Sequence, residues 1–316
     1  MLAVFFFFVP TGKTKSKKKQ KHLIRRGVGV VLAVIALLTV YQAADSVVSD
    51  ITEGSVAPAE GVLQVAFLDV GQGNCFVSVL DGEAYVVDCG GTKRPGEVAA
   101  DYLTSAGVDT VKFVLISHLH DDHANGLADL CEEKKILEII IPYTEGDPAL
   151  HAQIVTLAAE EGATLTVLEA DAERTLGGST LRMLTKHLNP VSEDQNENSI
   201  VGFCEYGEFR AMFTGDITSS AEKRLVTAYG KNLKCDVLSI PHHGSKSSSC
   251  SQFLETTDPV YGVISVGAKN TYGHPTEEVL SRLSYAGVKV LRTDALSTIL
   301  IRSDGVKMEV ASDYES

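Results

Sequence analysis

The chain has 316 residues, of which 44% are hydrophobic and 22% charged, a balance that is ordinary for a globular protein and does not indicate disorder or a multi-span membrane protein. Eight Lys and Arg residues and no acidic residue lie in the first 44 positions. Those positions therefore carry +8 of a formal total of −13, and the remainder carries −21. Such an acidic body disfavours non-specific binding to nucleic acid, and it is compatible with a nuclease only because bound metal ions add positive charge locally.

The N-terminal segment has the pattern of a targeting signal. Residues 1–26 contain a basic run, and residues 27–44 (GVGVVLAVIALLTVYQAA) are uncharged, at the lower limit of what spans a bilayer core. Basic residues before an apolar run place the N-terminus in the cytoplasm, so we predict a single-pass membrane anchor with the rest of the chain outside the cytoplasm. A cleaved signal peptide, which would release a secreted protein, and a buried helix are the alternatives. The polar residues 45–61 then form a linker to a domain at 62–316.

Strands and helices are mixed throughout residues 62–316. Asp81 and Gly82 form a strong hairpin-turn signal, and Gly107 and Gly162 mark the ends of helices. Strands are predicted at 62–69, 75–80, 84–87, 112–116, 136–141, 164–168, 180–184, 199–206, 209–214, 237–240, 260–266, 288–292, 297–301 and 306–310, and helices at 96–106, 148–161, 219–229 and 276–286. This mixture predicts the α/β or α+β class.

The six cysteines are scattered along the chain without a C-x-x-C pair. We predict that they are small buried core residues. A bridge between Cys75 and Cys89, on adjacent predicted strands, is the alternative in an oxidising compartment.

One short segment concentrates metal-binding residues. Residues 117–126 read SHLHDDHANG and follow a predicted buried strand, so that His118, His120, Asp122 and His123 lie within six positions. Imidazole nitrogen and carboxylate oxygen suit zinc, manganese or iron. Because side chains can leave the loop in two directions, this spacing serves two adjacent ions. The alternative is a polar surface loop with incidental histidines.

This loop resembles the signature of the metallo-β-lactamase superfamily. Downstream, the segment FTGD ends at Asp216, which resembles the carboxylate that bridges the two metal ions in that superfamily. The resemblance implies a four-layer αββα sandwich with two divalent metal ions, zinc or manganese.

Three further segments narrow the resemblance. They are FLDVGQG at 67–73, PHHGS at 241–245 and VISVGAKNTYGHP at 263–275. Together they are similar to the extracytoplasmic hydrolase domain of ComEC-type DNA-uptake proteins and its stand-alone relatives, which include phosphorylcholine esterases. The similarity covers residues 62–293. Because ComEC-type proteins have many membrane spans and this chain has one predicted span, a role in competence implies a partner from that system.

The two histidines of PHHGS are expected to divide two roles. One should complete the second metal site with Asp122, His123 and Asp216, and the other should face the substrate as a proton donor. If the segment is extended, adjacent side chains point in opposite directions, so both do not bind one ion. We expect His242 to be the ligand and His243 to be catalytic, with the reverse assignment left open.

Other residues are expected to support the site. His274 is placed to stabilise an anionic transition state or to protonate a leaving group, with helix capping or packing as the alternative. Ser245 either contacts a phosphoryl oxygen or forms a turn. Asp69, Gln72 and Asp88 are expected to brace the metal loop.

The first metal site departs from the superfamily pattern. Many members carry a third histidine upstream of the bridging Asp, whereas residues 196–199 of this chain read NENS. An amide oxygen is a weaker ligand, and we expect Asn198 to contact a metal ligand or the substrate. His187 is the only histidine near this stretch, and any link from it to a metal is open. The first site is therefore expected to be loose, or to fill only with substrate present.

Together these features predict a hydrolase that uses a metal-bound hydroxide, with Asp122, His243 and His274 as catalytic residues. The resemblance favours a phosphodiesterase or nuclease at the outer cell surface, acting on DNA or a phosphorylated envelope polymer. A hydrolase of a thioester, lactone or β-lactam is one alternative, and it would need an open apolar pocket. A non-catalytic binding module on the same fold is the other.

Overall fold

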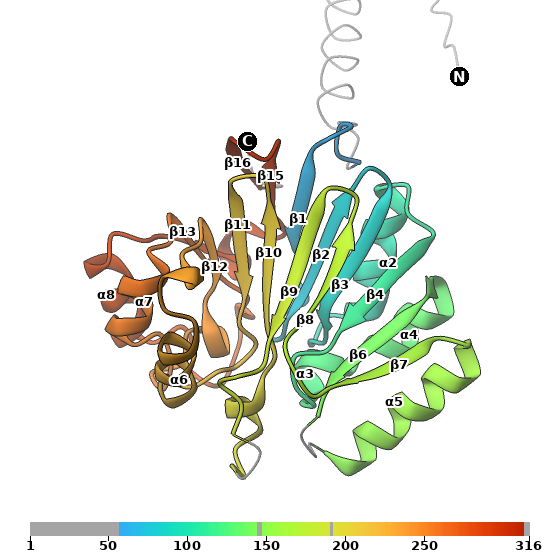
Figure 1. Cartoon of the computed structure of the whole chain (residues 1–316), viewed down its shortest axis with the longest axis horizontal. Coiled ribbons are helices and arrows are strands. Elements are labelled where there is room, and N and C mark those ends of the chain that lie inside the picture. Colours follow the sequence, from blue (N-terminus) through green and yellow to red (C-terminus); the bar gives the residue numbers. More distant parts are fainter. Residues whose placement is uncertain (1–56, 144–146, 190–191, 313–316) are drawn as a thin grey trace, which may run out of the picture. The chain divides into compact units, whose positions relative to one another are not determined.

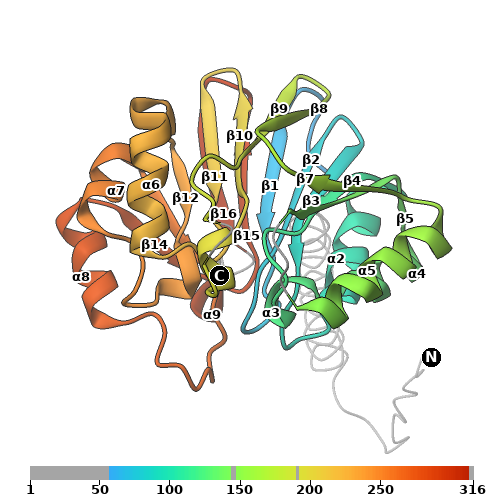
Figure 2. The ribbon, with the colours of Figure 1, turned by 60° about the horizontal axis from the view of Figure 1, so that its bottom comes forward.

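A computed structural model of the protein describes residues 57–143, 147–189 and 192–312. In these residues two β-sheets pack against each other, and helices cover the outer face of each sheet (Figure 1 and Figure 2). This is the four-layer αββα sandwich that the resemblance implies. The predicted anchor at 27–44 lies outside the described residues, as does most of the linker. Within the described part, no helix is long and apolar enough to cross a membrane.

The first sheet is formed by the N-terminal strands and the C-terminal hairpin. Its strands are β1 (Leu63–Phe67), β2 (Cys75–Leu80), β3 (Glu83–Cys89), β4 (Thr110–Leu115), β5 (Lys135–Ile136), β6 (Glu138–Pro142), β7 (Thr164–Leu168), β15 (Ile299–Ser303) and β16 (Met308–Ser312). Their order is β16-β15-β1-β2-β3-β4-β6-β7, with β5 paired to β4. Strand β15 therefore joins the sheet by pairing antiparallel to β1, and β16 pairs with β15 at the edge.

The second sheet comes from the later half of the chain. Its strands are β8 (Ala172–Leu176), β9 (Ser179–Leu184), β10 (Val201–Tyr206), β11 (Phe209–Phe213), β12 (Val237–Ser239), β13 (Tyr261–Ile264) and β14 (Lys289–Arg292). They are ordered β14-β13-β12-β11-β10-β9-β8, and the pairs from β11 to β14 are parallel. Because parallel strands end at the same edge, the loops that follow β11, β12 and β13 meet there.

Helices cover both outer faces, and apolar side chains fill the three spaces between the layers. The helices are α2 (Pro95–Ser105), α3 (Asp121–Ala124), α4 (Leu127–Glu133), α5 (Pro148–Glu161), α6 (Ser219–Tyr229), α7 (Ser251–Thr257), α8 (Glu277–Tyr285) and α9 (Thr293–Leu296), with 3₁₀ turns η1 (Gln195–Asn198), η2 (Gly230–Leu233) and η3 (Pro241–Gly244). One apolar cluster lies under α2, α4 and α5, one between the sheets, and one under α6, α7 and α8. The two inner sheets are thus buried on both faces and hold the loops at their edge rigidly.

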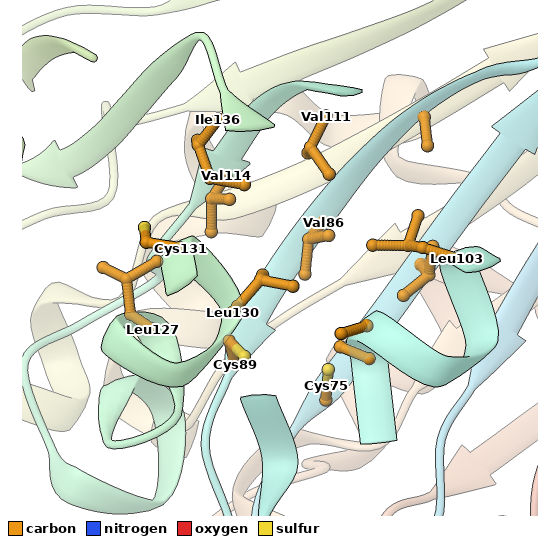
Figure 3. Packing of buried hydrophobic residues seen from close by; sticks show 14 of the residues in the cluster. Cys75, Val86, Cys89, Leu103, Val111, Val114, Leu127, Leu130, Cys131 and Ile136 are labelled. Atoms are coloured by element: carbon orange, nitrogen blue, oxygen red, sulfur yellow. The ribbon is translucent and has the colours of Figure 1, made fainter. Parts of the chain in front are cut away.

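The cysteines belong to this packing. Five are buried, Cys250 is half-buried, and all six are free thiols. Cys75 lies opposite Cys89 in the β2–β3 ladder, and Figure 3 shows both sulfur atoms among the apolar side chains under the helices. The prediction of buried core cysteines is confirmed for five of them, and the alternative bridge between Cys75 and Cys89 is not formed.

Most of the predicted elements are present, and the missed ones have weak patterns. The predicted helices at 148–161 and 219–229 match α5 and α6 residue for residue. Strand β8 (AERTL) was not predicted because it is polar and lies at a sheet edge, where only one of its residues is buried. Helices α4 and α7 have seven residues each, too few to show a helical period clearly.

Candidate metal centre

Loops from both sheets bring the candidate ligands together at one edge of the sandwich. The loop after β4 delivers His118 and His120 and continues into α3, which carries Asp122 and His123. Asp216 follows β11, and the histidines of PHHGS follow β12 in η3. Segments separated by about a hundred residues therefore meet because β4 and β11 end at the same edge.

Four side chains converge closely enough to hold a cation. Ligand atoms of Asp122, His123, Asp216 and His243 all lie within 4.8 Å of one another. The Nε2 atom of His123 is 3.1 Å from Oδ1 of Asp216, and Nε2 of His243 is 3.4 Å from Oδ2 of Asp122. His123 Nε2, Asp216 Oδ1 and His243 Nε2 are buried and have no hydrogen-bond partner among the described residues. Buried polar atoms are costly to leave unpaired, so this group fits a divalent metal ion.

Contacts at Nδ1 orient the two imidazole rings of this group. Nδ1 of His123 is 2.8 Å from Oδ2 of Asp88, whose carboxylate also accepts the backbone N–H of Ser117 at 2.7 Å. Nδ1 of His243 is 2.8 Å from the carbonyl oxygen of Ser265. Each acceptor fixes the proton on Nδ1 and leaves the Nε2 lone pair facing the centre, as metal-binding histidines require.

Charge in the group also favours a cation. Burial opposes ionisation of Asp216, yet the nearby charges of His123 and His243 hold the pKa of that carboxyl well below its ordinary value. Burial likewise raises the pKa of Asp122, but the nearby imidazoles of His243 and His123 outweigh it and leave the pKa below its usual range. Burial lowers the pKa of His123, but Asp216 and Asp88 together raise it well above normal. This raised pKa favours a second proton on the His123 ring, and a metal ion bound at Nε2 would displace that proton.

The centre opens into two adjoining cavities. The inner one, of about 190 Å³, is lined by Gln72, His120, Asp122, Asn196, Asp216, His242, His243, Tyr272 and His274. The outer one, of about 730 Å³, is lined by residues 71–72, 91–93, 121–122, 125 and 267–272. Gln72, Asp122 and Tyr272 line both cavities. We call the outer cavity the outer groove. A ligand bound in the outer groove can therefore extend to the candidate metal centre.

Comparison with known proteins agrees with this geometry. The family model of the metallo-beta-lactamase superfamily matches residues 68–268, which include the whole centre. The chain belongs to the metallo-β-lactamase superfamily.

Among curated superfamily relatives, ComE operon protein 3 of Bacillus subtilis is 30% identical over 262 residues, covering 76% of this chain and 33% of that protein. Competence protein ComA of Neisseria gonorrhoeae is 44% identical over 101 residues, covering 32% of this chain and 15% of that protein. This chain thus spans a third or less of these ComEC-type competence proteins. The solved metallo-beta-lactamase fold protein YhfI from Bacillus subtilis is 13% identical, with a TM-score of 0.52 over 76% of this chain and 99% of YhfI, which shows a shared fold.

The arrangement within this metallo-β-lactamase site favours His243 over His242 as the ligand, opposite to the preference from sequence. That preference assumed an extended segment. Instead His242 (φ 54°) and His243 (φ 53°) are both left-handed, a conformation that costs a non-glycine residue about 1–2 kcal/mol. Both histidines line the inner cavity, but the turn buries His243 in the four-residue group. His242 is half-buried, with Nε2 3.7 Å from Asp216 Oδ2 and its ring 5.7 Å from that of His274. The structure thus places His243, and not His242, in the four-residue group.

His118 and His120, the other predicted ligands, lie beside the four-residue group but are not part of it. The His118 ring is 4.1 Å from the His123 ring, and His118 Nε2 is 3.0 Å from His120 Nδ1. Burial lowers the pKa of His118 well below normal, and the neighbouring His123 adds to the effect, so His118 is neutral. Both rings could bind an ion through a ring nitrogen if the contact between His118 Nε2 and His120 Nδ1 were broken.

The asparagine stretch is arranged differently from the prediction. The Oδ1 atom of Asn198 accepts the backbone N–H of Asn189 at 2.8 Å, so this side chain braces a loop. His187 is turned away, with Nε2 2.9 Å from the carbonyl oxygen of Ser199. It is Asn196 that lines the inner cavity, with Oδ1 buried and without a hydrogen-bond partner in the described structure. Sequence spacing alone could not distinguish Asn196 from Asn198.

The remaining predicted residues have varied surroundings. Gln72 lines both cavities and accepts the N–H of Gly267 at 3.2 Å, which ties the two walls together. Asp69 contacts Lys93 Nζ at 2.6 Å and the N–H of Gly71, so it braces its own turn. Ser245 lines neither cavity, and its N–H donates to the carbonyl oxygen of His242, a turn role.

His274 lies at the mouth of the inner cavity. Burial lowers its pKa, with His242 and His243 adding to the effect, so its ring is neutral at neutral pH. Tyr272, which the sequence analysis did not single out, stacks on His274 with ring centroids 5.9 Å apart and is 68% exposed. An aromatic residue directly before the GHP segment was the signal that the sequence offered. These two rings can contact the part of a substrate that lies between the two cavities.

Proposed function

We propose that the protein is a metal-dependent phosphodiesterase. The observation that carries this proposal is the convergence of Asp122, His123, Asp216 and His243, with three buried ligand atoms unpaired, beside a groove lined mainly by glycines and residues with polar side chains. Both carboxyl groups are ionised, so the centre attracts divalent cations. Ions bound there would supply Lewis acidity and would lower the pKa of a nearby water toward neutrality.

The protein's own residues then divide the remaining work. Asp88 and the Ser265 carbonyl hold the two buried imidazoles in the tautomer that presents Nε2. His242 and His274 face the inner cavity, where an imidazole N–H can donate to a developing oxyanion or leaving oxygen. Gln72, which bonds to Gly267, keeps the walls of the groove at a fixed separation.

The lining of the outer groove favours a phosphate ester over an acyl substrate. Its side chains are Gln, Thr, Lys, Asp, Asn and Tyr, and no aliphatic side chain larger than that of alanine lines it. Lys269, which is exposed and has no ion pair among the described residues, adds a positive charge suited to phosphate. A thioester, lactone or β-lactam hydrolase is less well served, since its substrates need an apolar pocket.

Similarity to competence proteins supports an envelope location and an anionic polymer substrate. We propose that the substrate is DNA or a phosphorylated envelope polymer, that residues 27–44 anchor the chain with the hydrolase domain outside the cytoplasm, and that a competence-system protein is a partner. These proposals rest on the names of the relatives and on the charge pattern of the N-terminus.

Hydrolysis by the full chain tests the proposal. Samples loaded with zinc or with manganese are given bis(p-nitrophenyl) phosphate, single-stranded DNA, a phosphocholine ester, a lactone and a thioester. We expect phosphodiester turnover that is lost in His243→Ala and kept in His151→Ala, a control on α5 that lines neither cavity. Turnover of the lactone or thioester without the diester would favour the acyl hydrolase. Metal binding without any turnover would indicate a binding module.

A further inference from the structure

The first metal position lacks the third histidine that many members of the superfamily carry. His118 and His120 offer two imidazoles, and Asp216 is the carboxylate shared with the four-residue group. His242 and His274 also line the inner cavity, each with a buried Nδ1 that has no hydrogen-bond partner among the described residues, but the proposed function places both toward the substrate. His187 is the nearest candidate by sequence, but its Nε2 is bonded to the Ser199 carbonyl oxygen. A protein group that takes the place of this histidine must therefore come from another residue that lines the inner cavity.

Among the cavity residues to which the proposed function gives no other role, Asn196 meets this requirement. Its Oδ1 is buried and unpartnered among the described residues, in the same cavity as His120 and Asp216. A buried amide oxygen without a donor is costly, and a cation held by His120 and Asp216 would satisfy it. The neighbouring Asn198 has its oxygen satisfied and cannot fill this role.

The backbone around Asn196 is fixed relative to Asp216. The Ser199 hydroxyl donates to the Asn196 carbonyl oxygen at 3.0 Å and accepts the backbone N–H of Asp216 at 3.1 Å. Asp194 accepts the Asn196 N–H at 3.1 Å, and Glu197 accepts from Thr218 at 3.1 Å. This network fixes the backbone that carries the amide relative to the backbone of Asp216, which would limit the movement of a metal ligand there.

We propose that Asn196 takes the place of the third histidine at the first metal position and that its amide oxygen shifts the preference of that position from zinc toward manganese. The set would be two imidazoles, one amide oxygen and one carboxylate. Carbonyl and carboxylate oxygens suit manganese, whereas a third imidazole suits zinc. The first ion therefore binds more weakly than the second and exchanges first. This inference rests on the metal-dependent function proposed above.

Metal content measured without substrate tests the inference. The full chain is dialysed against zinc or manganese, and bound ions are counted by mass spectrometry while a competing chelator is titrated. We expect Asn196→Ala to weaken the weaker of the two sites by about 10-fold or more. Asn196→His should raise the zinc-to-manganese affinity ratio of that site by about 10-fold, since it restores the imidazole. Asn232→Ala, on an exposed turn, is the surface control, and Asn198→Ala is the neighbouring control; both should keep two ions.

The possible outcomes separate the two proposals. Two ions with unchanged affinities in Asn196→Ala would overturn the inference, and so would loss of an ion in Asn198→Ala with none lost in Asn196→Ala. A wild-type chain that binds two ions but does not hydrolyse the diester would refute the phosphodiesterase and leave the Asn196 assignment in place. A wild-type chain that binds no ion would overturn both.

Discussion

Asp88 provides a sharp test of how the centre is built, because it touches a ligand without facing the cavities. Its Oδ2 is 2.8 Å from His123 Nδ1, and its two oxygens accept both the N–H and the hydroxyl of Ser117. Asp88 has φ 58°, a left-handed conformation that asparagine tolerates well. Asp88→Asn therefore keeps the backbone and the bond from the Ser117 N–H while changing one oxygen into an N–H donor.

The consequence for His123 follows from hydrogen-bond directions. An amide N–H beside Nδ1 requires that nitrogen to accept, which moves the imidazole proton to Nε2, the atom that should face the metal. Loss of such an orienting partner weakens metal binding by about 10- to 100-fold, or about 1.4 to 2.7 kcal/mol. The free energy of unfolding of the metal-free protein should change by only about 1 kcal/mol, since the Ser117 N–H keeps its acceptor.

Isothermal titration with a competing chelator measures the affinity, and thermal unfolding of the metal-free protein measures the stability. Asp258→Asn is a matched control, because Asp258 is also left-handed (φ 44°) and its carboxylate pairs with Lys234, away from both cavities. Wild-type affinity in Asp88→Asn would refute the orienting role. A loss of affinity that matched a general loss of fold would refute it as well.

Three further predictions concern histidines and one buried glutamate. His243→Ala should lose at least one bound ion per chain, whereas His242→Ala should keep its ions and lose turnover; elemental analysis with the reverse pattern would restore His242 as the ligand. Glu222 is buried on α6, and burial raises its pKa from 4.5 to about 7, so its contribution to stability is present at low pH and is lost as pH rises toward 7. Relative to Glu222→Gln, the wild type should lose about 3 kcal/mol of unfolding free energy between pH 4.5 and 7, and parallel curves from denaturant titrations would contradict this. Burial lowers the pKa of His187 from 6.5 to about 4, so the unfolding free energy should instead fall by about 3 kcal/mol as pH drops from 6.5 to 4. His187→Gln should not show this fall. Equal acid sensitivity of the wild type and His187→Gln would contradict the prediction.

Local patterns in the sequence were sufficient for much of the fold and for part of the site. The H-x-H-x-D-H spacing identified His123 and Asp122 because one short loop carries them, and the αββα sandwich followed from resemblance. Long helices with clear ends, such as α5 with Asp147 at its start and Gly162 at its end, were predicted to the residue. Short or edge elements gave too little periodicity to be recognised.

The remaining assignments in the site depended on backbone conformation that the sequence does not show. The choice between His242 and His243 turns on two consecutive left-handed residues, which nothing in PHHGS indicates. Similarly, only the turn of η1 decides that Asn196 faces the cavity while Asn198 bonds to Asn189. In both cases two adjacent or near-adjacent residues of one chemical type differ only in direction.

The central claim is that a metal centre built on Asp216 hydrolyses a phosphodiester, and one titration tests it most directly. Metal-free full chain is titrated with manganese and, in parallel, with zinc, while bound metal and bis(p-nitrophenyl) phosphate turnover are followed in the same samples. We predict that turnover rises with occupancy toward two ions per chain, and that Asp216→Ala binds fewer ions and shows no turnover. Turnover that is independent of bound metal, or that persists in Asp216→Ala, would contradict the account.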